Sequence, residues 1–213
     1  MRKLKVLGLV VTAVLAVGMF VVSAAFAFES TWLDKGATVS KAILVHSETT
    51  SSRVSFADPK GGLFGEEVEV LCNGSGEGTI GPGKAGTLTK FTVVGCETMK
   101  GICGEPDVEL INTPWTNSIE LIGASFYNDL TTTVGTKMVG YNVVCNKIVE
   151  DKCEVALARA LLENVAGGDV NNLFNSADSN QPKFVCSRSG NGGLLNGIIV
   201  AVIGGENLAV SEG

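Results

Sequence analysis

The sequence predicts an all-β fold, an antiparallel β-sandwich or distorted barrel that is cross-linked by disulfides and follows an N-terminal signal peptide. Short apolar or alternating runs are separated by clusters of Gly, Asn, Asp and Ser, which is typical of strands joined by turns. The chain holds six cysteines, an even number, after a segment typical of export. These observations indicate a small exported domain whose sheets are held by sulfur bridges.

The N-terminal segment has the parts of a secretory signal peptide. Residues 1–5 carry three basic side chains and no acid, and residues 6–22 are almost wholly apolar. Ala25 and Ala27 stand at the small-residue positions that signal peptidase reads, so we expect cleavage before Phe28. An uncleaved anchor is the alternative, since an apolar run of about 17 residues is only just short of spanning a bilayer. The small-residue pattern favours cleavage.

Cleavage would leave a signal peptide, residues 1–27, and a single β-rich extracellular domain, residues 28–213. At roughly 186 residues the second part has the size of one ordinary domain. We expect it to be secreted or held at the cell surface, with no stable membrane span after cleavage. We also expect a monomer.

The mature domain is acidic. The chain has 16 basic and 22 acidic residues, and cleavage removes Arg2, Lys3 and Lys5, which leaves 13 against 22 and a formal charge of −9. Binding to nucleic acid is not expected, because phosphate contacts require clustered Lys and Arg. The expected partner is an extracellular or cell-wall ligand of unknown identity.

The six cysteines predict three disulfides in an oxidising compartment. The short spacing within two pairs of sequence neighbours favours a disulfide across a turn in each pair. The remaining two cysteines both begin the pattern C-x-x-S-G-x-G, which favours their pairing. The favoured pairs are Cys96 with Cys103, Cys145 with Cys153, and Cys72 with Cys186. Six cysteines allow about 15 pairings, among which sequence alone does not choose. Zinc is not expected, because there is no CxxC pair and only one histidine.

Strands are predicted where apolar residues alternate with polar ones. In residues 67–72, Val68, Val70 and Cys72 would face one side of a sheet, and Glu67 and Glu69 the other. In residues 197–203 both faces are apolar, which predicts a strand buried on both sides. The full set of further candidates is 42–46, 53–57, 86–94, 108–112, 118–127, 137–144, 183–186 and 197–203.

Residues 154–165 fit two structures. They are rich in Ala, Leu, Glu and Arg, which favour a helix that would end at Gly167-Gly168. Their apolar residues also recur at every second position, and the same glycines could turn a hairpin into residues 169–174. We favour the hairpin.

Two glycine patterns imitate nucleotide-binding motifs. Residues 76–81 match GxGxxG and residues 78–84 match GxxxxGK, but Ala85 stands where a phosphate loop needs Ser or Thr. No helix pattern opens there, so we expect a flexible turn loop and no cofactor.

Catalytic constellations are incomplete. His46 is the only histidine, so any Ser-His-Asp or Cys-His mechanism would have to use it, and no GxSxG motif is present. A glycan hydrolase could instead use two carboxylates. Candidates by residue type alone are Glu66, Glu67, Glu69, Glu105, Asp107 and Glu109. We expect no catalytic residue and no metal ligand.

One aromatic residue is a candidate ligand contact. Trp115 follows Pro114 in a segment that reads as a loop, where an indole ring could stack on a ligand such as a sugar. The alternative is a core residue, because an aromatic ring buries so much apolar area.

Several phrases resemble a family. Cys72-Asn-Gly-Ser-Gly-Glu-Gly, Asn112-Thr-Pro-Trp115, Tyr141-Asn-Val-Val-Cys145 and Phe184-Val-Cys186 are similar to segments of uncharacterised secreted six-cysteine β-rich proteins of actinobacteria. The resemblance covers most of residues 68–211. It implies an exported β-rich domain and carries no assigned activity.

These observations predict a secreted or envelope-associated, non-enzymatic β-domain with a structural or binding role. The alternative is a secreted glycan hydrolase that works with carboxylates.

Overall fold

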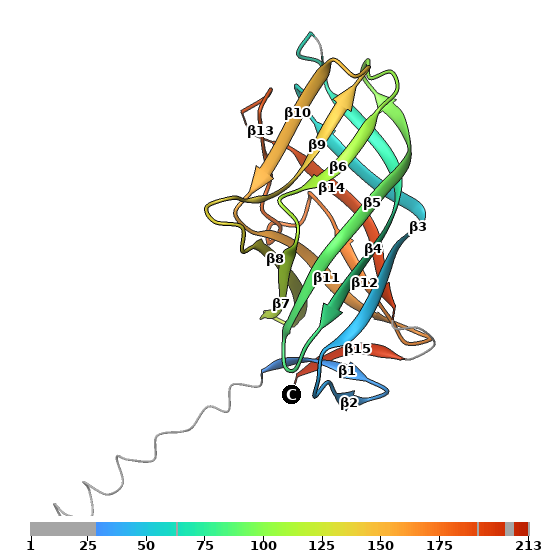
Figure 1. The fold of residues 1–213 in the computed structure, drawn as a ribbon, viewed down its shortest axis with the longest axis vertical. Coiled ribbons are helices and arrows are strands. Elements are labelled where there is room, and N and C mark those ends of the chain that lie inside the picture. The colour runs from blue at the N-terminus through green and yellow to red at the C-terminus, as the bar shows by residue number, and fades with distance from the viewer. Residues whose placement is uncertain (1–28, 63, 191, 203–206, 213) are drawn as a thin grey trace, which may run out of the picture.

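The computed structural model describes residues 29–62, 64–190, 192–202 and 207–212 (Figure 1). The predicted signal peptide lies outside this range. No helix among the described residues is long and apolar enough to cross a membrane.

The described chain is built from antiparallel strands, which confirms the predicted all-β class. The strands are β1 (Ser30–Asp34), β2 (Ala37–Thr38), β3 (Ile43–Asp58), β4 (Val68–Ile80), β5 (Ala85–Lys100), β6 (Asp107–Ile111), β7 (Trp115–Ile122), β8 (Ser125–Thr132), β9 (Val139–Cys145), β10 (Val149–Val155), β11 (Ala158–Val165), β12 (Asp169–Phe174), β13 (Val185–Cys186), β14 (Leu194–Val202) and β15 (Leu208–Glu212).

The main sheet closes on itself. Its strands follow the order β11-β12-β14-β3-β4-β5-β7-β8, and β8 pairs with β11 to complete the closed barrel. A small sheet, β15-β1-β2, lies at one end, and a second, β13-β10-β9-β6, lies at the other (Figure 1). Of the two architectures left open by the sequence, the barrel is therefore the one adopted.

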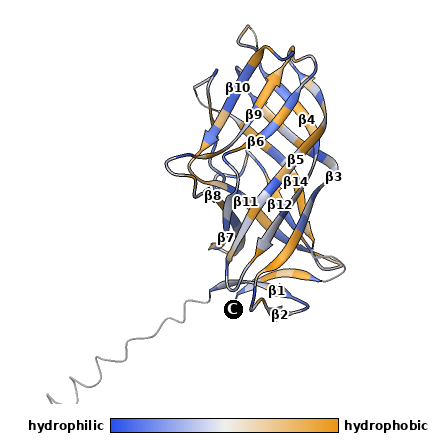
Figure 2. Cartoon of the chain, in the orientation of Figure 1, coloured by the Kyte–Doolittle hydropathy of each residue, from blue (hydrophilic) through white to orange (hydrophobic). Residues whose placement is uncertain are grey.

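The interior holds two apolar clusters, one toward each small sheet. The first contains Trp115, Phe174 and Leu130 from the barrel together with Tyr141 of β9. The second contains Trp32 of β1, with Leu208 and Val210 of β15, Ile119, Val170 and Ile80. Hydrophobic and hydrophilic residues alternate along the strands, as Figure 2 shows, so each strand turns one face inward. Each small sheet thus supplies side chains to the core at its end of the barrel.

The glycine-rich segment is a strand and not a flexible loop. In β4 the buried positions alternate through Val68, Val70 and Cys72, as predicted, and the alternation continues through Gly74, Gly76 and Gly78 to Ile80. A Cβ on Gly74 would lie 2.4 Å from the Phe91 ring, and one on Gly76 would lie 2.7 Å from it. The glycines therefore make room for an aromatic ring inside the barrel, and the nucleotide-motif spacing is the by-product of strand alternation.

Two other strand predictions need correction. Residues 118–127 are not one strand but parts of β7 and β8, because Gly123, with φ of 64°, turns the chain between them. The strand predicted at residues 197–203 is not buried on both sides: Ala201 is buried, whereas Ile198 and Val200 are half-buried. β14 is a wall strand with one face on the barrel interior.

The ambiguous segment is a hairpin, as favoured from its alternation. β11 and β12 pair antiparallel with Val165 opposite Asp169, and Gly167 and Gly168 have positive φ in the turn. The helix-forming composition is overridden because Ala158, Ala160 and Leu162 fill the barrel core on one strand face.

The six cysteines form three disulfides, as predicted, but the favoured pairing is wrong. The bonds are Cys72–Cys96, Cys103–Cys145 and Cys153–Cys186. In the β9–β10 hairpin Cys153 lies opposite Tyr141. Tyr141 is four residues from Cys145 along β9, so Cys145 and Cys153 are about 13 Å apart, too far for a disulfide. Each bond instead joins segments that the fold, and not the sequence, makes neighbours.

Candidate functional site

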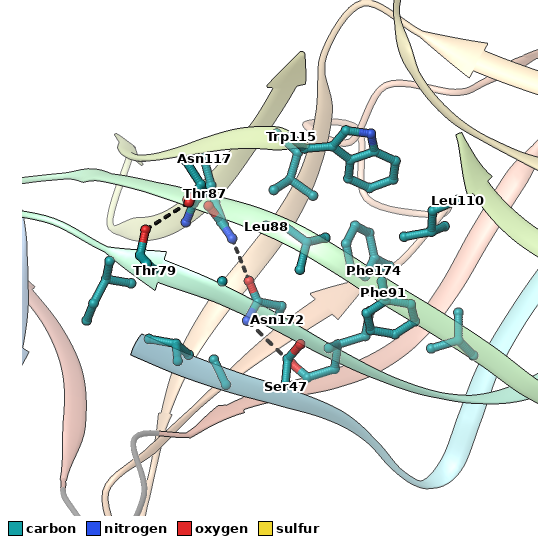
Figure 3. Close-up of a pocket in the computed structure, with 18 of the residues that line it drawn as sticks. Ser47, Thr79, Thr87, Leu88, Phe91, Leu110, Trp115, Asn117, Asn172 and Phe174 are labelled. Carbon is teal, nitrogen blue, oxygen red and sulfur yellow. Dashed lines mark hydrogen bonds between the residues drawn. The ribbon is translucent and has the colours of Figure 1, made fainter. Parts of the chain in front are cut away.

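The barrel encloses a cavity of about 100 Å³ between its two apolar clusters (Figure 3). Every described side chain in its wall is uncharged. The wall is made by Trp32, Val45, Ser47, Val54, Phe56, Gly78, Thr79, Ile80, Thr87, Leu88, Phe91, Leu110, Trp115, Asn117, Asn128, Leu130, Asn172, Phe174, Leu195, Ile199 and Ala201. This is the size of space that small barrels leave for a small ligand or a few waters.

Three wall strands repeat one inward pattern, an asparagine between two apolar residues. Since alternate residues of a strand face the same side, all three members of each triplet share a face. The triplets are Trp115-Asn117-Ile119 on β7, Phe126-Asn128-Leu130 on β8 and Val170-Asn172-Phe174 on β12. We call Asn117, Asn128 and Asn172 the asparagine belt. It lies between the two apolar clusters, because Trp115 belongs to the first cluster and Ile119 to the second.

The belt is partly hydrogen-bonded within itself. Asn128 Nδ2 donates to Asn172 Oδ1 at 2.8 Å, and Asn172 Nδ2 donates to the carbonyl oxygen of Ile199 at 3.4 Å. The hydroxyls of Thr79 and Thr87 lie 2.8 Å apart at the polar end of the cavity (Figure 3). These bonds fix the orientation of the Asn172 amide and one end of the Asn128 amide.

Four polar atoms of the wall are buried without a hydrogen-bond partner among the residues that the structure describes. They are Asn117 Oδ1, Asn128 Oδ1, Ser47 Oγ and Trp32 Nε1. Asn128 is 7% exposed and Trp32 is 1% exposed, so bulk water does not satisfy them. Buried polar groups are nearly always hydrogen-bonded to protein or to ordered water, so these atoms point to a small ligand or ordered water in the cavity.

The other end of the cavity is apolar. Trp115, Leu110 and Phe174 gather there, with Leu88 beside them (Figure 3). Trp115 is 3% exposed at the start of β7, and its Nε1 donates to the carbonyl oxygen of Ile111 at 2.9 Å. The residue singled out as a ligand contact is therefore not in an exposed loop. Its indole ring is satisfied at the nitrogen and presents an apolar surface to the cavity.

One seam of the cavity wall lies where β5 leaves β7 and passes β6. β5 pairs with β7 over residues 85–88 and then continues to Lys100 beside β4, while β6 lies alongside it. Leu88, Phe91 and Leu110 line the cavity at this seam and are half-buried.

The catalytic candidates weighed from the sequence lie elsewhere. His46 is exposed on β3, where its register partner on β4 is Glu77, and Glu77 in turn faces Lys90. It lies on the outer surface of the barrel, in a hollow that Glu48 and Thr92 also line.

Three of the six carboxylates considered for a hydrolase, Glu67, Glu69 and Glu105, are held by surface ion pairs. Lys100 Nζ lies 3.1 Å from both Glu67 and Glu69, and Ser55 Oγ donates to Glu69 at 2.7 Å. The Ser55 hydrogen bond and the Lys100 charge lower the pKa of Glu69. Glu105 lies 3.4 Å from Lys147. A lowered pKa keeps a carboxylate ionised, which is unsuited to the general acid of a glycosidase.

The sequence did not reveal a buried pair of aspartates beneath the β6–β9–β10–β13 sheet. Asp58 is 3% exposed and Asp151 is 5% exposed. Burial, followed by the hydrogen bond with Asp58, raises the pKa of Asp151 to about 6. Ser187 Oγ and the backbone N–H of Arg188 donate to Asp151 Oδ1 at 3.0 and 3.1 Å. The two carboxyls share a site that holds a proton more readily than a solvated aspartate does.

Asp151 also lies beside the Cys153–Cys186 bond. The potential ligand atoms of Asp151, Cys153 and Cys186 lie within 4.8 Å of one another, a spacing that could hold a metal ion. Both sulfurs are in the disulfide, so neither is a thiolate that could bind one.

Comparisons with protein-family models, with curated proteins and with solved structures gave no match for this chain. The resemblance to secreted actinobacterial proteins stays a prediction. What stands is a β-rich protein with six cysteines in three disulfides.

The asparagine belt had a signal in the sequence that went unread. Each belt residue sits in an apolar-x-Asn-x-apolar run, such as Trp115 to Ile119 or Val170 to Phe174. An asparagine in phase with inward apolar residues indicates a polar group facing the core. Residues 169–174 were predicted as the second strand of a hairpin, without an inward role for Asn172.

Proposed function

We propose that this protein is an exported, non-enzymatic binding domain that holds a small uncharged molecule inside its barrel. The observation that carries the proposal is the cavity itself, with apolar walls, the asparagine belt and buried polar atoms without a protein partner. Ligand sites are typically concave and mostly apolar, with a few polar groups that orient the ligand.

The three disulfides support an extracellular location for the protein. Three disulfides suggest an oxidising, extracellular environment, since cytosolic thiols are kept reduced. Within that environment the domain would be secreted or retained at the cell envelope after cleavage before Phe28. An extracellular binding domain meets its ligand in dilute solution, where a preformed site lowers the ordering cost of binding.

The chain provides its own reporter for the experiment. Trp32 and Trp115 are its only tryptophans, and both line the cavity. Titrating the refolded mature protein with small aromatic solutes, toluene and phenol, should change tryptophan fluorescence in a saturable way. Isothermal titration calorimetry on the same samples should give a stoichiometry of about one, as one cavity predicts.

A matched pair of variants locates the site. Ala201 lines the cavity and Ala37 is exposed on β2. Ala201→Leu should weaken binding of either solute at least tenfold by filling the space, and Ala37→Leu should leave it unchanged. Where Ala201→Leu does not fold, Val45→Ile, a smaller addition to the same wall, replaces it. The absence of saturable binding in the wild-type protein, or equal binding in both variants, would overturn the proposal.

A further inference from the structure

We infer that the ligand carries a hydroxyl or N–H donor that binds the asparagine belt, joined to a compact apolar body that fills the end of the cavity near Trp115. This inference rests on the proposed function and names the chemical class of its ligand. It excludes charged molecules and pure hydrocarbons as the preferred ligand.

The need for a donor follows from the belt's hydrogen bonds. Asn128 uses its Nδ2 to donate to Asn172, which leaves Asn128 Oδ1 as a buried acceptor without a donor. Asn117 Oδ1 is a second such acceptor. Amide oxygens accept and never donate, so only a group with an O–H or N–H can satisfy them. A hydrocarbon would leave both acceptors unsatisfied.

A hydroxyl fits better than an N–H alone because the cavity also holds an unused donor. Trp32 Nε1 donates to nothing in the described protein and lines the same cavity. Ser47 Oγ, also without a partner, can either donate or accept. A ligand oxygen that both donates and accepts therefore matches the mixture of groups left open.

The rest of the ligand must be small and apolar. Trp115, Phe174 and Leu130 belong to one apolar cluster and face the cavity together. The cavity measures about 100 Å³, smaller than the roughly 150 Å³ of an apolar protein cavity that accommodates benzene. A single aromatic ring or a short branched chain is therefore the upper limit of size for the apolar body.

Charge is excluded by the composition of the wall. Every described side chain that lines the cavity is neutral, so an ionised carboxylate or ammonium would lose its hydration without gaining a counter-charge. Neutral phenols and small alcohols remain as the class that satisfies both ends of the cavity.

The deciding experiment compares four solutes of nearly equal size on the wild-type protein: phenol, anisole, toluene and benzoate. Phenol has a donor, anisole has only an acceptor, toluene has neither, and benzoate is charged. We expect phenol to bind at least tenfold more tightly than anisole or toluene, and benzoate not to bind. A site that hydrogen-bonds its ligand discriminates strongly against an analogue without the donor.

A belt variant shows where the discrimination arises. In Asn128→Leu the dissociation constants of phenol and toluene should come within twofold of each other. Asn73→Leu, at an exposed position of β4, should keep the wild-type preference for phenol. Where Asn128→Leu does not fold, the phenol and anisole comparison on the wild-type protein decides alone. Toluene or anisole binding as tightly as phenol would overturn the donor inference while the binding function stands. No saturable binding of any solute would overturn the proposed function itself.

Discussion

At the scale of single residues, the Asp58–Asp151 pair ties stability to pH. Both carboxyls are buried next to Tyr141, whose own pKa is raised by burial and then by the two aspartates. Asp151 has a pKa of about 6 in the folded chain, whereas an unfolded aspartate titrates near 3.9. The folded state therefore holds a proton over a pH range in which the unfolded state has already lost it.

The sign of the effect is fixed by that order of titration. The favourable contribution of Asp151 is complete below pH of about 4 and is lost as pH rises through about 6. Over this range it changes the free energy of unfolding by at most roughly 3 kcal/mol. Asp151→Asn should remove this pH dependence and be more stable than the wild type at pH 7, because a carboxamide can donate to Asp58 without ionising. Urea denaturation at pH 4, 5, 6 and 7 measures the free energy of unfolding of both proteins.

The exposed strand residue Asp107 provides the control. Asp107→Asn should keep the wild-type slope between pH 4 and 7. A wild-type protein whose stability rises steadily over this interval, with Asp151→Asn rising in parallel, would contradict the assignment.

A second residue-scale prediction concerns the glycines under Phe91. A Cβ at Gly76 would meet the Phe91 ring and Ser47 Oγ at 2.7 Å and the backbone oxygen of Lys90 at 2.8 Å, so a backbone shift is required. Gly76→Ala should lower the free energy of unfolding by about 1–3 kcal/mol. At Gly81 the nearest atom is 3.6 Å away. The free energy of unfolding of Gly81→Ala should stay within about 0.5 kcal/mol of the wild-type value in the same urea titration. Equal losses of stability at Gly76 and Gly81 would contradict this packing.

At the scale of elements, the disulfides join strands that are neighbours in space. Cys72–Cys96 links β4 to β5 in the barrel wall, and Cys153–Cys186 links β10 to β13 in the sheet at one end. Cys103–Cys145 ties the segment after β5 to the end of β9. The last bond fastens that end sheet to the segment that follows the barrel strand β5.

Removing that bond should cost much of the domain's stability. The loop it closes spans a sequence separation of 42 residues, and its loss in the double variant Cys103→Ala with Cys145→Ala should cost about 4 kcal/mol on the loop-entropy model. The neighbouring change Ile102→Ala, at an exposed side chain, should cost less than about 0.5 kcal/mol. Guanidinium denaturation distinguishes them, and a double variant as stable as Ile102→Ala would refute the role of the bond.

At the scale of the whole molecule, we predict that the protein is exported and that its cysteines are oxidised to disulfides, and one experiment tests both. Mass spectrometry of protein from the culture medium or cell surface should find Phe28 at the N-terminus and no thiol that reacts with an alkylating reagent before reduction. Non-reducing peptide mapping should recover the three observed links. Protein recovered from the cytosol with Met1 intact and its cysteines alkylatable would contradict both the signal peptide and the compartment.

The sequence predicted the local structure better than the site. Alternation through Val68, Val70 and Cys72 placed a strand and its inward face correctly, because side chains of a strand alternate whatever surrounds it. Asn128 and Asn172 lie in phase with inward apolar residues, but the sequence does not show that their strands close around a shared cavity. Asp58 and Asp151 were missed because only the folded chain brings them together.

The sequence by itself determined the all-β class and the participation of six cysteines in disulfides, and it favoured the β11–β12 hairpin, since these depend on short-range alternation, turn glycines and residue count. Only the tertiary structure decided that the main sheet closes, which cysteine pairs with which, and that three asparagines face a shared cavity. The physical reason is that strand periodicity fixes which residues share a face, whereas closure and register between distant strands fix which face is inside and what meets there.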